Sequence, residues 1–479
     1  MINRPQLFIG GAWTTPSTSA HHDVIEAATE KPLGTVALAA PADIDAAVQS
    51  ARTAFAGPWR GLTADERADV LDAFAAALRA RARDTAMLVS RENGMPISLS
   101  KGANGIAPAS IIAYYAGLIR KGSTQDTRAG VFGGRTVVRR EPVGVVAAIT
   151  PWNYPQALAA MKIGPALAAG CTVVLKPAPE TALDAYVFAD AAVEAGLPAG
   201  VINVVPADRD ESAYLVAHPG IDKVAFTGST GAGRAIGEVC GRLLRPVTLE
   251  LGGKSASIVL PDADLDVFAR ALPEVSLANN GQTCHASTRI LAPCTRLREV
   301  VAAVTDTVSA LTIGDPLDKA TAVGPLVSAA QRDRVLGFIE AGRADGFAIT
   351  TGGGVPASRD QGWFVEPTVF TDVDNSSRIA QEEIFGPVLT VIGYDDEDEA
   401  VRIANDSPYG LGGTIWTSDE EHGLALAARI ETGTIGVNHY ALDFAAPFGG
   451  VKASGLGREL GPEGLAPYLT AKSVYFATR

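Results

Sequence analysis

The sequence predicts an α/β protein whose main sheet is parallel and covered by helices on both faces. Short β-branched runs alternate with longer stretches in which apolar residues recur at helical spacing, the pattern of strand–helix–strand units. The chain has 479 residues, of which 47% are hydrophobic and 19% are charged. We therefore expect about two to four structural units with a sizeable core, and the composition excludes a disordered chain.

Helices are predicted first, between about residues 41 and 93, where ADIDAAVQSARTAF and ERADVLDAFAAALRARA have apolar residues at helical spacing. Asp43, Asp45 and Asp65 lie near the expected helix starts, where the helix dipole favours negative charge. From Gly144 onward strands are predicted at VVAAI (145–149), TVVL (172–175), VINVV (201–205), KVAF (223–226), VTLEL (247–251) and ASIVL (256–260). A polar, β-rich stretch at 122–142 precedes them and is interpreted as a hairpin arm.

Charge and hydropathy exclude two classes of partner. Asp and Glu number 53 against 40 Lys and Arg, a formal charge of −13, so we expect no nucleic-acid partner. The longest apolar stretch, Ala157–Leu175, is broken by Lys162, Pro165 and Gly170, so we expect no membrane span. The N-terminal segment lacks the pattern of a signal peptide. These features favour a soluble protein of the cytoplasm.

The four cysteines do not form a disulfide framework, and their spacing contains no CxxC pair, so we predict no metal site. Cys171 and Cys240 lie in apolar contexts typical of buried, inert thiols, and Cys294 has no supporting context. Cys284 differs, because it lies in the polar segment NNGQTCHAS (279–287).

The segment ITPWNYP (149–155) directly follows the first predicted strand and carries an amide side chain. Pro151 and Pro155 restrict the loop, and the Asn153 amide can donate two hydrogen bonds. A rigid amide donor suits an oxyanion hole, where one such donor is worth about 10²–10³ in rate. The alternative is a turn Asn that bonds its own backbone.

The glycine-rich segment FTGSTGAG (226–233) follows another predicted strand and opens a helix. Its glycines allow a ligand to approach the backbone, and the helix N-terminus offers N–H groups to an anion. The spacing is not that of the Rossmann fingerprint, so a simple tight turn remains an alternative. Lys176, at a strand end in VVLKPAPE, is expected either to bond a ribose or to be a solvated surface lysine.

Glu250 and Cys284 complete the set of candidate reactive groups. Glu250, in LELGGKS (249–255), lies among apolar residues and paired glycines, which raise a carboxylate pKa and suit a general base. The alternative is an edge-strand Glu directed to water. Because Glu250 offers a base and Asn153 an amide donor, we interpret Cys284 as a nucleophile. Adjacent side chains diverge, so the sequence does not imply a dyad with His285.

Six motifs together resemble the NAD(P)-dependent aldehyde dehydrogenase superfamily, of the hydrolytic, non-acylating type. They are PWNYP, FTGSTGAG, ELGGKS, GQTC, EEIFGPV (382–388) and PFGGVKASGLGRE (447–459). They occur in the family's order and spacing over nearly the whole chain, which makes the resemblance highly specific.

The resemblance implies an aldehyde dehydrogenase-like α/β fold with a Rossmann-type cofactor domain, an α/β catalytic domain and a small β oligomerisation arm. The NAD(P)-binding domain would comprise residues 1–121 and 141–252, the catalytic domain 253–467, and the arm 122–140 and 468–479. Because family members are dimers or tetramers, it also implies a homodimer or a homotetramer.

The resemblance implies that Cys284 attacks the aldehyde carbon while Asn153 and the Cys284 N–H hold the oxyanion. Hydride transfer to the nicotinamide leaves a thioester, and Glu250 activates the water that hydrolyses it. Lys162 and Glu459 match a proton relay of some members. The implied cofactor residues are Thr150, Pro151, Trp152, Lys176, Pro179, Gly228, Ser229, Gly233, Leu251, Glu383 and Phe385.

One departure from the family concerns the choice of cofactor. Many NAD-preferring members carry a Glu three residues after the ribose-binding Lys, where it bonds the 2′-hydroxyl. Here that position is Pro179, followed by Glu180, which weakens discrimination against NADP. We expect NAD as the cofactor, with NADP possible.

The substrate pocket implied by the resemblance consists of Tyr154, Leu158, Met161, Thr283, His285 and Phe444, with Tyr114 or Tyr115 nearby. This apolar and aromatic set favours a hydrophobic aliphatic, terpenoid or aromatic aldehyde. Two alternatives are a coenzyme A-acylating semialdehyde dehydrogenase and a scaffold that binds nucleotide without turnover. Such acylating members usually lack the Glu of ELGGKS, and a scaffold need not keep Cys284, Glu250 and Asn153 together.

Overall fold

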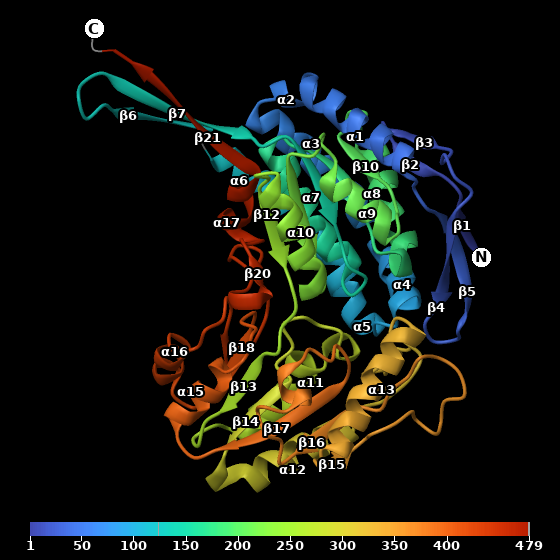
Figure 1. Ribbon diagram of the computed structural model, residues 1–479, viewed down its shortest axis with the longest axis vertical. Coiled ribbons are helices and arrows are strands. Elements are labelled where there is room, and N and C mark those ends of the chain that lie inside the picture. The colour runs from blue at the N-terminus through green and yellow to red at the C-terminus, as the bar shows by residue number, and fades with distance from the viewer. Residues whose placement is uncertain (123, 478–479) are drawn as a thin grey trace.

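The computed structural model describes residues 1–122 and 124–477, and four sheets organise this part of the chain. An eight-stranded and a seven-stranded sheet form two α/β units, and a narrow arm projects from the first (Figure 1). A smaller sheet joins β1 (Ile2–Arg4), β5 (Lys31–Ala37) and β4 (His21–Glu26). Of the helices described, none has both the length and the apolar character that crossing a membrane requires.

The eight-stranded sheet has a parallel centre and antiparallel strands at its edges. Its order is β20 (Gly455–Leu456), β12 (Val247–Glu250), β11 (Lys223–Thr227), β8 (Val145–Ile149), β9 (Thr172–Lys176), β10 (Ile202–Val204), β2 (Leu7–Ile9) and β3 (Ala12–Thr14). The strands from β12 to β10 are parallel and almost wholly buried, as expected for apolar runs covered on both faces. The strands predicted between residues 145 and 251 are thus confirmed.

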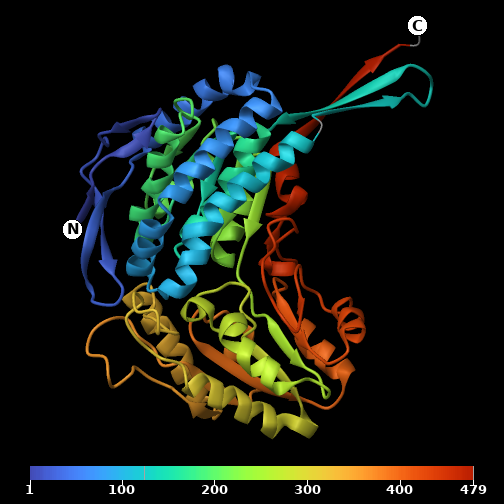
Figure 2. The same ribbon diagram turned by 180° about the vertical axis from the view of Figure 1, so that it is seen from behind.

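Helices cover both faces of this sheet (Figure 2). One layer contains α3 (Ala64–Ala80), α6 (Ala107–Lys121), α7 (Pro155–Ala169) and α8 (Ala182–Glu194), and the other contains α1 (Pro41–Ala56), α9 (Arg209–Ala217) and α10 (Thr230–Arg242). Helices α1 and α3 confirm the two helical patterns predicted near the N-terminus. Shorter connecting helices are α2 (Pro58–Gly61), α4 (Ala82–Asn93), α5 (Ile97–Ser100) and a π-helical turn at Lys101–Ile106.

The local sequence explains where the helices next to the strand ends begin. Helix α7 starts at Pro155, where the missing N–H costs nothing, and ends before Gly170, whose φ of 93° is left-handed. Helix α10 starts after Ser229, whose hydroxyl accepts the Ala232 N–H at 3.3 Å. Both helices therefore begin directly at the carboxyl ends of β8 and β11.

The seven-stranded sheet forms the second α/β unit. Its order is β15 (Ala348–Thr351), β16 (Thr368–Thr371), β17 (Val388–Tyr394), β14 (Arg289–Pro293), β13 (Ala256–Val259), β18 (Gly413–Trp416) and β19 (Gly436–Val437). Helices α11 (Leu265–Ser276) and α12 (Leu297–Ser309) pack on one face. On the other lie α13 (Ala329–Ala344), α14 (Arg378–Gln381), α15 (Glu397–Asn405) and α16 (Glu420–Ala427). The predicted strand ASIVL is β13, so it lies in this second sheet.

The arm is a three-stranded antiparallel sheet in which β7 (Arg135–Pro142) pairs with β6 (Gln125–Ala129) and with β21 (Leu469–Phe476). The hairpin predicted at 122–142 is confirmed. In Figure 1 the arm extends away from both α/β units, with the C-terminal strand along its length.

A late segment of the chain returns to the first sheet. Strand β20 pairs antiparallel with β12, with Gly455 opposite Glu250. Helix α17 (Gly461–Leu465) then packs against α7. The chain from 455 to 465 therefore closes one edge of the eight-stranded sheet next to Glu250.

Candidate active site

A cavity of about 340 Å³ lies at the carboxyl ends of β8 and β11, between the two α/β units. Strand β8 neighbours both β9 and β11, so the strand order reverses here, and ligands of open α/β sheets bind at such a point. The cavity is lined by Pro151, Trp152, Asn153, Thr227, Gly228, Ser229, Leu251, Gly252, Cys284, Gln331, Arg334, Glu383 and Phe385.

Cys284 is the thiol of this cavity, and it lies on an irregular segment before β14. A Cβ on Gly253 would lie 2.4 Å from the Cys284 carbonyl oxygen, so only glycine allows the two segments to meet this closely. Burial raises the pKa of Cys284 to about 12, and the negative charges of Glu383 and Glu250 add to the effect. Without a bound ligand the group is therefore a neutral thiol near pH 7.

Asn153 is tied to the Cys284 segment by a network of buried amides. Its Nδ2 donates to the Gln282 carbonyl at 3.1 Å. The backbone carbonyl of Asn153 accepts hydrogen bonds from Nδ2 of Asn93 and from Nδ2 of Asn279, both at 2.9 Å. One N–H of the Asn153 amide thus fixes its orientation, and the second is available to a ligand oxygen. The turn-Asn alternative is not what the structure contains, since these bonds join residues far apart in sequence.

Glu250 ends β12 and is buried, and neither of its carboxylate oxygens has a hydrogen-bond partner in the described residues. Burial raises its pKa well above the ordinary range, and the nearby Glu459 carboxylate raises it further. A Cβ on Gly449 would lie 2.6 Å from Glu250 Oε1, so a glycine leaves space for this side chain. The solvent-directed alternative for Glu250 is therefore wrong.

Lys162 and Glu459 form a buried ion pair behind Glu250. Lys162 Nζ lies 2.8 Å from Glu459 Oε1 and 2.5 Å from the Thr227 hydroxyl oxygen. Thr227 also lines the cavity, so this pair is connected to the site through one hydroxyl. The two residues predicted to share a relay are therefore in direct contact.

His285 lies nearer to the thiol than the sequence argument implied. Its Nδ1 is 4.0 Å from Cys284 Sγ, a long contact at the limit for sulfur. The ring stacks on Tyr440 with centroids 4.8 Å apart and meets Phe448 edge-on at 6.0 Å. Burial lowers the pKa of His285 to about 4, so the imidazole is neutral at physiological pH.

The predicted cofactor residues divide into two groups. Seven of them line the cavity beside Asn153 and Cys284, with Phe385 edge-on to Trp152 at 5.2 Å. Thr150, Lys176, Pro179 and Gly233 do not line it but lie at or beyond the same strand ends or in α10. Lys176 is 8% exposed, so the surface-lysine alternative is wrong, and burial lowers its pKa to about 8.

These residues fit a dinucleotide. The N-terminus of α10 follows Gly228 and Ser229 at the cavity, where a pyrophosphate would meet N–H groups. Glu383 faces the cavity and accepts the Gly253 N–H at 3.0 Å, and burial raises its pKa to about 7. Carboxylates of this kind accept hydrogen bonds from ribose hydroxyls.

The predicted substrate residues do not line this cavity, and several of them pack in the same apolar cluster as Cys284. Tyr154 Oη is 2.7 Å from the Thr283 hydroxyl. Leu158 and Met161 are buried on α7, and Phe444 packs against the same apolar cluster as Cys284, Tyr154 and Tyr114. This cluster around the thiol is therefore apolar and aromatic.

Besides Thr227 and Gly252, which line the cavity and lie inside the motifs FTGSTGAG and ELGGKS, sequence reasoning missed Gln331, Arg334 and Tyr440. Gln331 and Arg334, on α13, line the cavity and donate to the carbonyls of Phe385 and Glu383 at 2.8 and 2.7 Å. Their i, i+3 spacing on a helix is the only local signal. Tyr440 was passed over although it lies only four residues before Phe444, because only the fold places it against His285.

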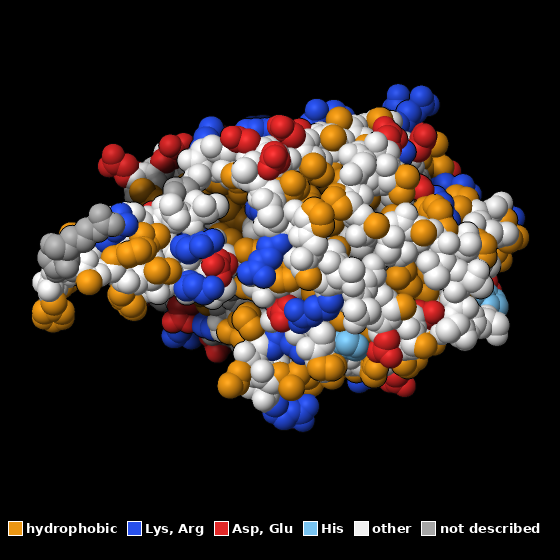
Figure 3. Space-filling view, turned by 90° about the horizontal axis from the view of Figure 1, so that it is seen from above, with side chains coloured by type: hydrophobic (Ala, Val, Ile, Leu, Met, Phe, Trp, Pro, Cys, Tyr) orange, Lys and Arg blue, Asp and Glu red, His pale blue; other side chains and the backbone are white. Residues whose placement is uncertain are grey.

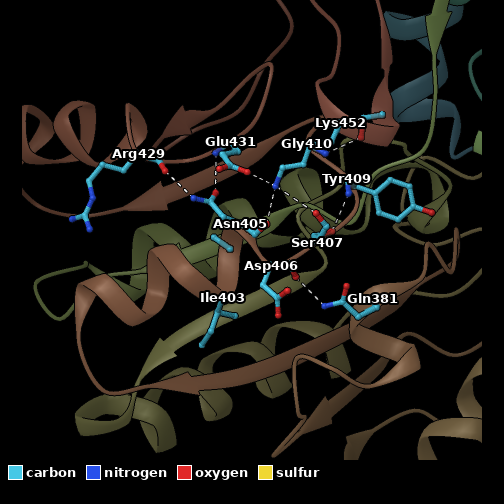
Figure 4. Close-up of polar contacts among 12 residues, drawn as sticks. Gln381, Ile403, Asn405, Asp406, Ser407, Tyr409, Gly410, Arg429, Glu431 and Lys452 are labelled. Carbon is cyan, nitrogen blue, oxygen red and sulfur yellow. Dashed lines mark hydrogen bonds and ion pairs between the residues drawn. The ribbon is translucent and has the colours of Figure 1, made fainter.

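A polar network holds the segment behind the site in place (Figure 4). The Asn405 amide accepts the Glu431 N–H at 2.8 Å and donates to the Arg429 carbonyl at 2.9 Å. Lys452 Nζ binds the Asn405 carbonyl at 2.8 Å and the Glu431 carboxylate at 2.5 Å. The network fixes the loop from 405 to 410 relative to 452.

Ser454 connects this network to Glu250. Its hydroxyl accepts the Gly410 N–H at 2.9 Å and donates to the Gly252 carbonyl at 2.7 Å. Its carbonyl accepts the Leu251 N–H at 2.9 Å. The two residues after Glu250 are therefore held by one buried serine.

Comparison with known proteins identifies the family. The sequence model that describes the aldehyde dehydrogenase family matches residues 13–474 of this chain. The chain belongs to the aldehyde dehydrogenase family. It is thus an enzyme with aldehyde dehydrogenase activity, as the six motifs predicted.

Individual relatives of this aldehyde dehydrogenase cover its whole length. Geranial dehydrogenase of Castellaniella defragrans is 54% identical over 475 residues, which is 99% of either chain. A Mycobacterium tuberculosis aldehyde dehydrogenase complexed with NAD⁺ is 47% identical, with a TM-score of 0.97 and 99% coverage of both chains. A variant Pseudomonas syringae aldehyde dehydrogenase, complexed with NAD⁺ and octanal, is 40% identical, with a TM-score of 0.94 over 98% of this chain and 96% of that one.

Proposed function

We propose that this aldehyde dehydrogenase oxidises a hydrophobic aldehyde to the carboxylic acid with NAD⁺, through a covalent intermediate on Cys284. The observation that carries the proposal is that Cys284 and Asn153 line one cavity with the dinucleotide-type residues Gly228, Ser229 and Glu383. The NAD⁺-bound structures of relatives support the choice of cofactor.

In the proposed mechanism Cys284 Sγ releases its proton to solvent water in the cavity and attacks the aldehyde carbon. The second N–H of Asn153 and the Cys284 backbone N–H stabilise the oxyanion. When bound, the nicotinamide supplies the hydride acceptor, and a thioester remains on Cys284. Glu250 takes a proton from the water that hydrolyses the thioester, which releases the acid and the Cys284 thiolate. The thiolate then regains a proton from solvent.

Lys162 and Glu459 are proposed to carry the proton away from Glu250. The pair is buried, and Glu459 Oε2 has no partner in the described part of the chain, so this oxygen is available to a water. The negative charge of Glu459 raises the pKa of Glu250, so the protonation of one carboxylate affects that of the other. The assignment predicts that Glu459→Gln slows hydrolysis of the thioester more than its formation.

For the substrate we propose an acyclic terpenoid aldehyde. The 54% identity to a geranial dehydrogenase and the aromatic surroundings of His285, Tyr440 and Phe448 support this class. Medium-chain aliphatic aldehydes are the second candidate, since a relative binds octanal. Thr283 and Tyr154 satisfy each other by a hydrogen bond, which leaves an apolar surface for the chain of the aldehyde.

The test measures reduced nicotinamide with geranial, octanal and a carboxylate-bearing semialdehyde, with NAD⁺ and NADP⁺, in the absence of coenzyme A. We expect kcat/KM to be highest for geranial with NAD⁺ and lowest for the semialdehyde. Cys284→Ala should abolish turnover and retain cofactor binding; oxidation by this variant would exclude the mechanism. Turnover that requires coenzyme A would favour the acylating alternative, against which Glu250 argues.

We also infer a homo-oligomer, a dimer or a tetramer, assembled through the arm. Strands β6 and β21 are the edges of the arm sheet, and exposed edges are templates for pairing with another chain. Val131, Phe132 and Tyr475 on the arm are 91%, 101% and 79% exposed. We propose an NAD(P)-binding domain of residues 1–121 and 141–252, a catalytic domain of 253–467 and an arm of 122–140 and 468–479. Light scattering coupled to size exclusion tests the oligomer, and Phe132→Ser should weaken it.

A further inference from the structure

A second cavity, of about 380 Å³, lies at the base of the arm, remote from Cys284. Four arginines line it, Arg60, Arg67, Arg139 and Arg140, against a single carboxylate, that of Glu141. Figure 3 shows Lys and Arg side chains gathered beside the base of the arm, next to hydrophobic side chains. In a chain of net negative charge, this local excess of positive charge needs a physical explanation.

Arg67 is the buried cation of this cavity. It is 8% exposed, and its Nη atoms donate only to backbone carbonyls, of Ala168 at 3.1 Å and Leu62 at 2.9 Å. Its Nε has no partner, and no ion pair joins it to a carboxylate of the described residues. A buried charge is costly unless it is paired. The guanidinium lies over the Trp59 ring at 5.9 Å and contributes a positive potential that no carboxylate of the described residues neutralises by pairing.

The contacts of the other three arginines leave donors in the cavity that could bind an anion. Arg139 Nε lies 3.5 Å from Glu141, but this carboxylate is held more closely by Lys472, at 2.8 Å. Arg60 lies over the Phe55 ring at 5.2 Å, and with Lys472 and Arg139 it lowers the pKa of Glu141. Arg140 pairs with Asp126 at 2.7 Å. Lys472, Arg139 and Arg60 thus share the one Glu141 carboxylate, which leaves an excess of donors at Arg60 and Arg139 near the buried Arg67.

Apart from Thr124, the remaining side chains of the cavity wall are apolar. Leu118 and Ile119 of α6 face it from one element, and Leu465 and Leu469 face it from the C-terminal segment. A fully solvated anion such as phosphate gains nothing from these side chains, whereas an aliphatic chain does. We propose that this cavity binds an amphipathic monocarboxylate, with the carboxylate at Arg60 and Arg139 and the aliphatic chain on the leucine-lined wall.

Photoaffinity labelling tests the site with a diazirine analogue of octanoate on the intact, native protein. We expect label in peptides that contain residues 60–67, 118–122 or 465–469, and we expect octanoate to displace it. The Arg60→Ala/Arg139→Ala double variant should weaken binding of octanoate at this site by about tenfold or more, since charge-assisted hydrogen bonds are lost. Its kcat/KM for the aldehyde substrate should stay unchanged.

Arg120→Ala is the matched control, because Arg120 lies on α6 but pairs with Asp69 and Asp72 and does not line the cavity. Labelling of this variant should equal that of the wild type. Displacement by octanol as effective as by octanoate would overturn the role of the arginines. Displacement by phosphate as effective as by octanoate would overturn the amphipathic class. Labelling only near Cys284, or none in these peptides, would overturn the site itself.

Discussion

Lys162 Nζ lies 2.8 Å from Glu459 Oε1, and both side chains are almost completely removed from solvent. The two residues are 297 positions apart, on α7 and on the segment that follows β20. Because Glu459 also raises the pKa of Glu250, the same ion pair that holds α7 to the segment after β20 also affects the protonation of the proposed base. Its disruption is therefore expected to affect both stability and catalysis.

Replacing Lys162 by Met should lower the free energy of unfolding by about 3–5 kcal/mol, because an unpaired carboxylate would remain buried. Urea denaturation measures the change, and Lys121→Met, at the exposed end of α6, is the control. A second effect is expected on hydrolysis of the thioester, since Lys162 lowers the pKa of Glu250. A loss below about 1 kcal/mol would contradict the importance of the buried pair.

Glu250→Gln should leave formation of the acyl-enzyme largely intact and slow its hydrolysis by about 10²–10⁴. The expected signature is a burst of reduced nicotinamide of one equivalent per site, followed by slow turnover. Mass spectrometry should detect an acyl adduct on Cys284. Glu238→Gln, on the exposed face of α10, should behave as wild type. Steady-state turnover at the normal rate in E250Q would show that another group is the base.

Alkylation of Cys284 by iodoacetamide, without cofactor, should accelerate about tenfold per pH unit between pH 7 and 9. The thiolate is the reactive form, and burial raises the thiol pKa to about 12, so the thiolate fraction still increases throughout this range. Glu383→Gln removes a negative charge that raises this pKa, so alkylation at pH 8 should become several-fold faster. Glu382→Gln, exposed and adjacent, is the control. A rate that reaches a plateau below pH 8 would be inconsistent with this picture.

Asp184→Asn should reduce the loss of stability with rising pH. Asp184 on α8 is buried beside Glu92 and accepts from Gln156 Nε2 at 2.7 Å, and burial raises its pKa to about 8. Between about pH 4 and pH 8 the folded state keeps a proton that the unfolded state releases, so the unfolding free energy falls as pH rises. Asn keeps the acceptor for Gln156 and carries no charge.

Thermal denaturation at pH 5 and pH 8.5 measures this effect. We expect the difference in melting temperature between the two pH values to be smaller in Asp184→Asn than in the wild type. Asp210→Asn, at an exposed position of α9, should leave the difference unchanged. Equal differences in all three proteins would mean that Asp184 is charged in the folded state.

Ser454→Ala should destabilise the protein by about 1–3 kcal/mol, because the Gly410 N–H and the Gly252 carbonyl would lose their buried partner. The residues after Glu250 would also be less constrained, so the hydrolytic step should slow. Ser309→Ala, at an exposed position of α12, provides the comparison. Unchanged stability and unchanged burst kinetics together would refute the role of Ser454.

The sequence predicted what local patterns and motifs encode. Buried β-branched runs gave β8 to β13, and composition singled out Asn153, Glu250 and Cys284. Tyr440, Gln331 and Arg334 were missed because their role depends on contacts across the fold. For the same reason the sequence alone could not decide whether the side chains of Lys176 and Glu250 are buried or solvated. Strand β20 was also missed, since a strand of two residues, one of them Gly455, carries no periodic signal.

The pairing of β20 with β12 has a consequence for synthesis of the protein. Gly252 and Ser454 are 202 residues apart. At translation rates of ~5–20 residues per second, the nascent chain presents an open β12 edge for about 10–40 s before its partner leaves the ribosome. During this interval the edge can pair with other chains, and Glu250 lacks its enclosure. We therefore expect chaperones to bind most strongly to ribosome-bound chains that have not yet been extended to residue 455.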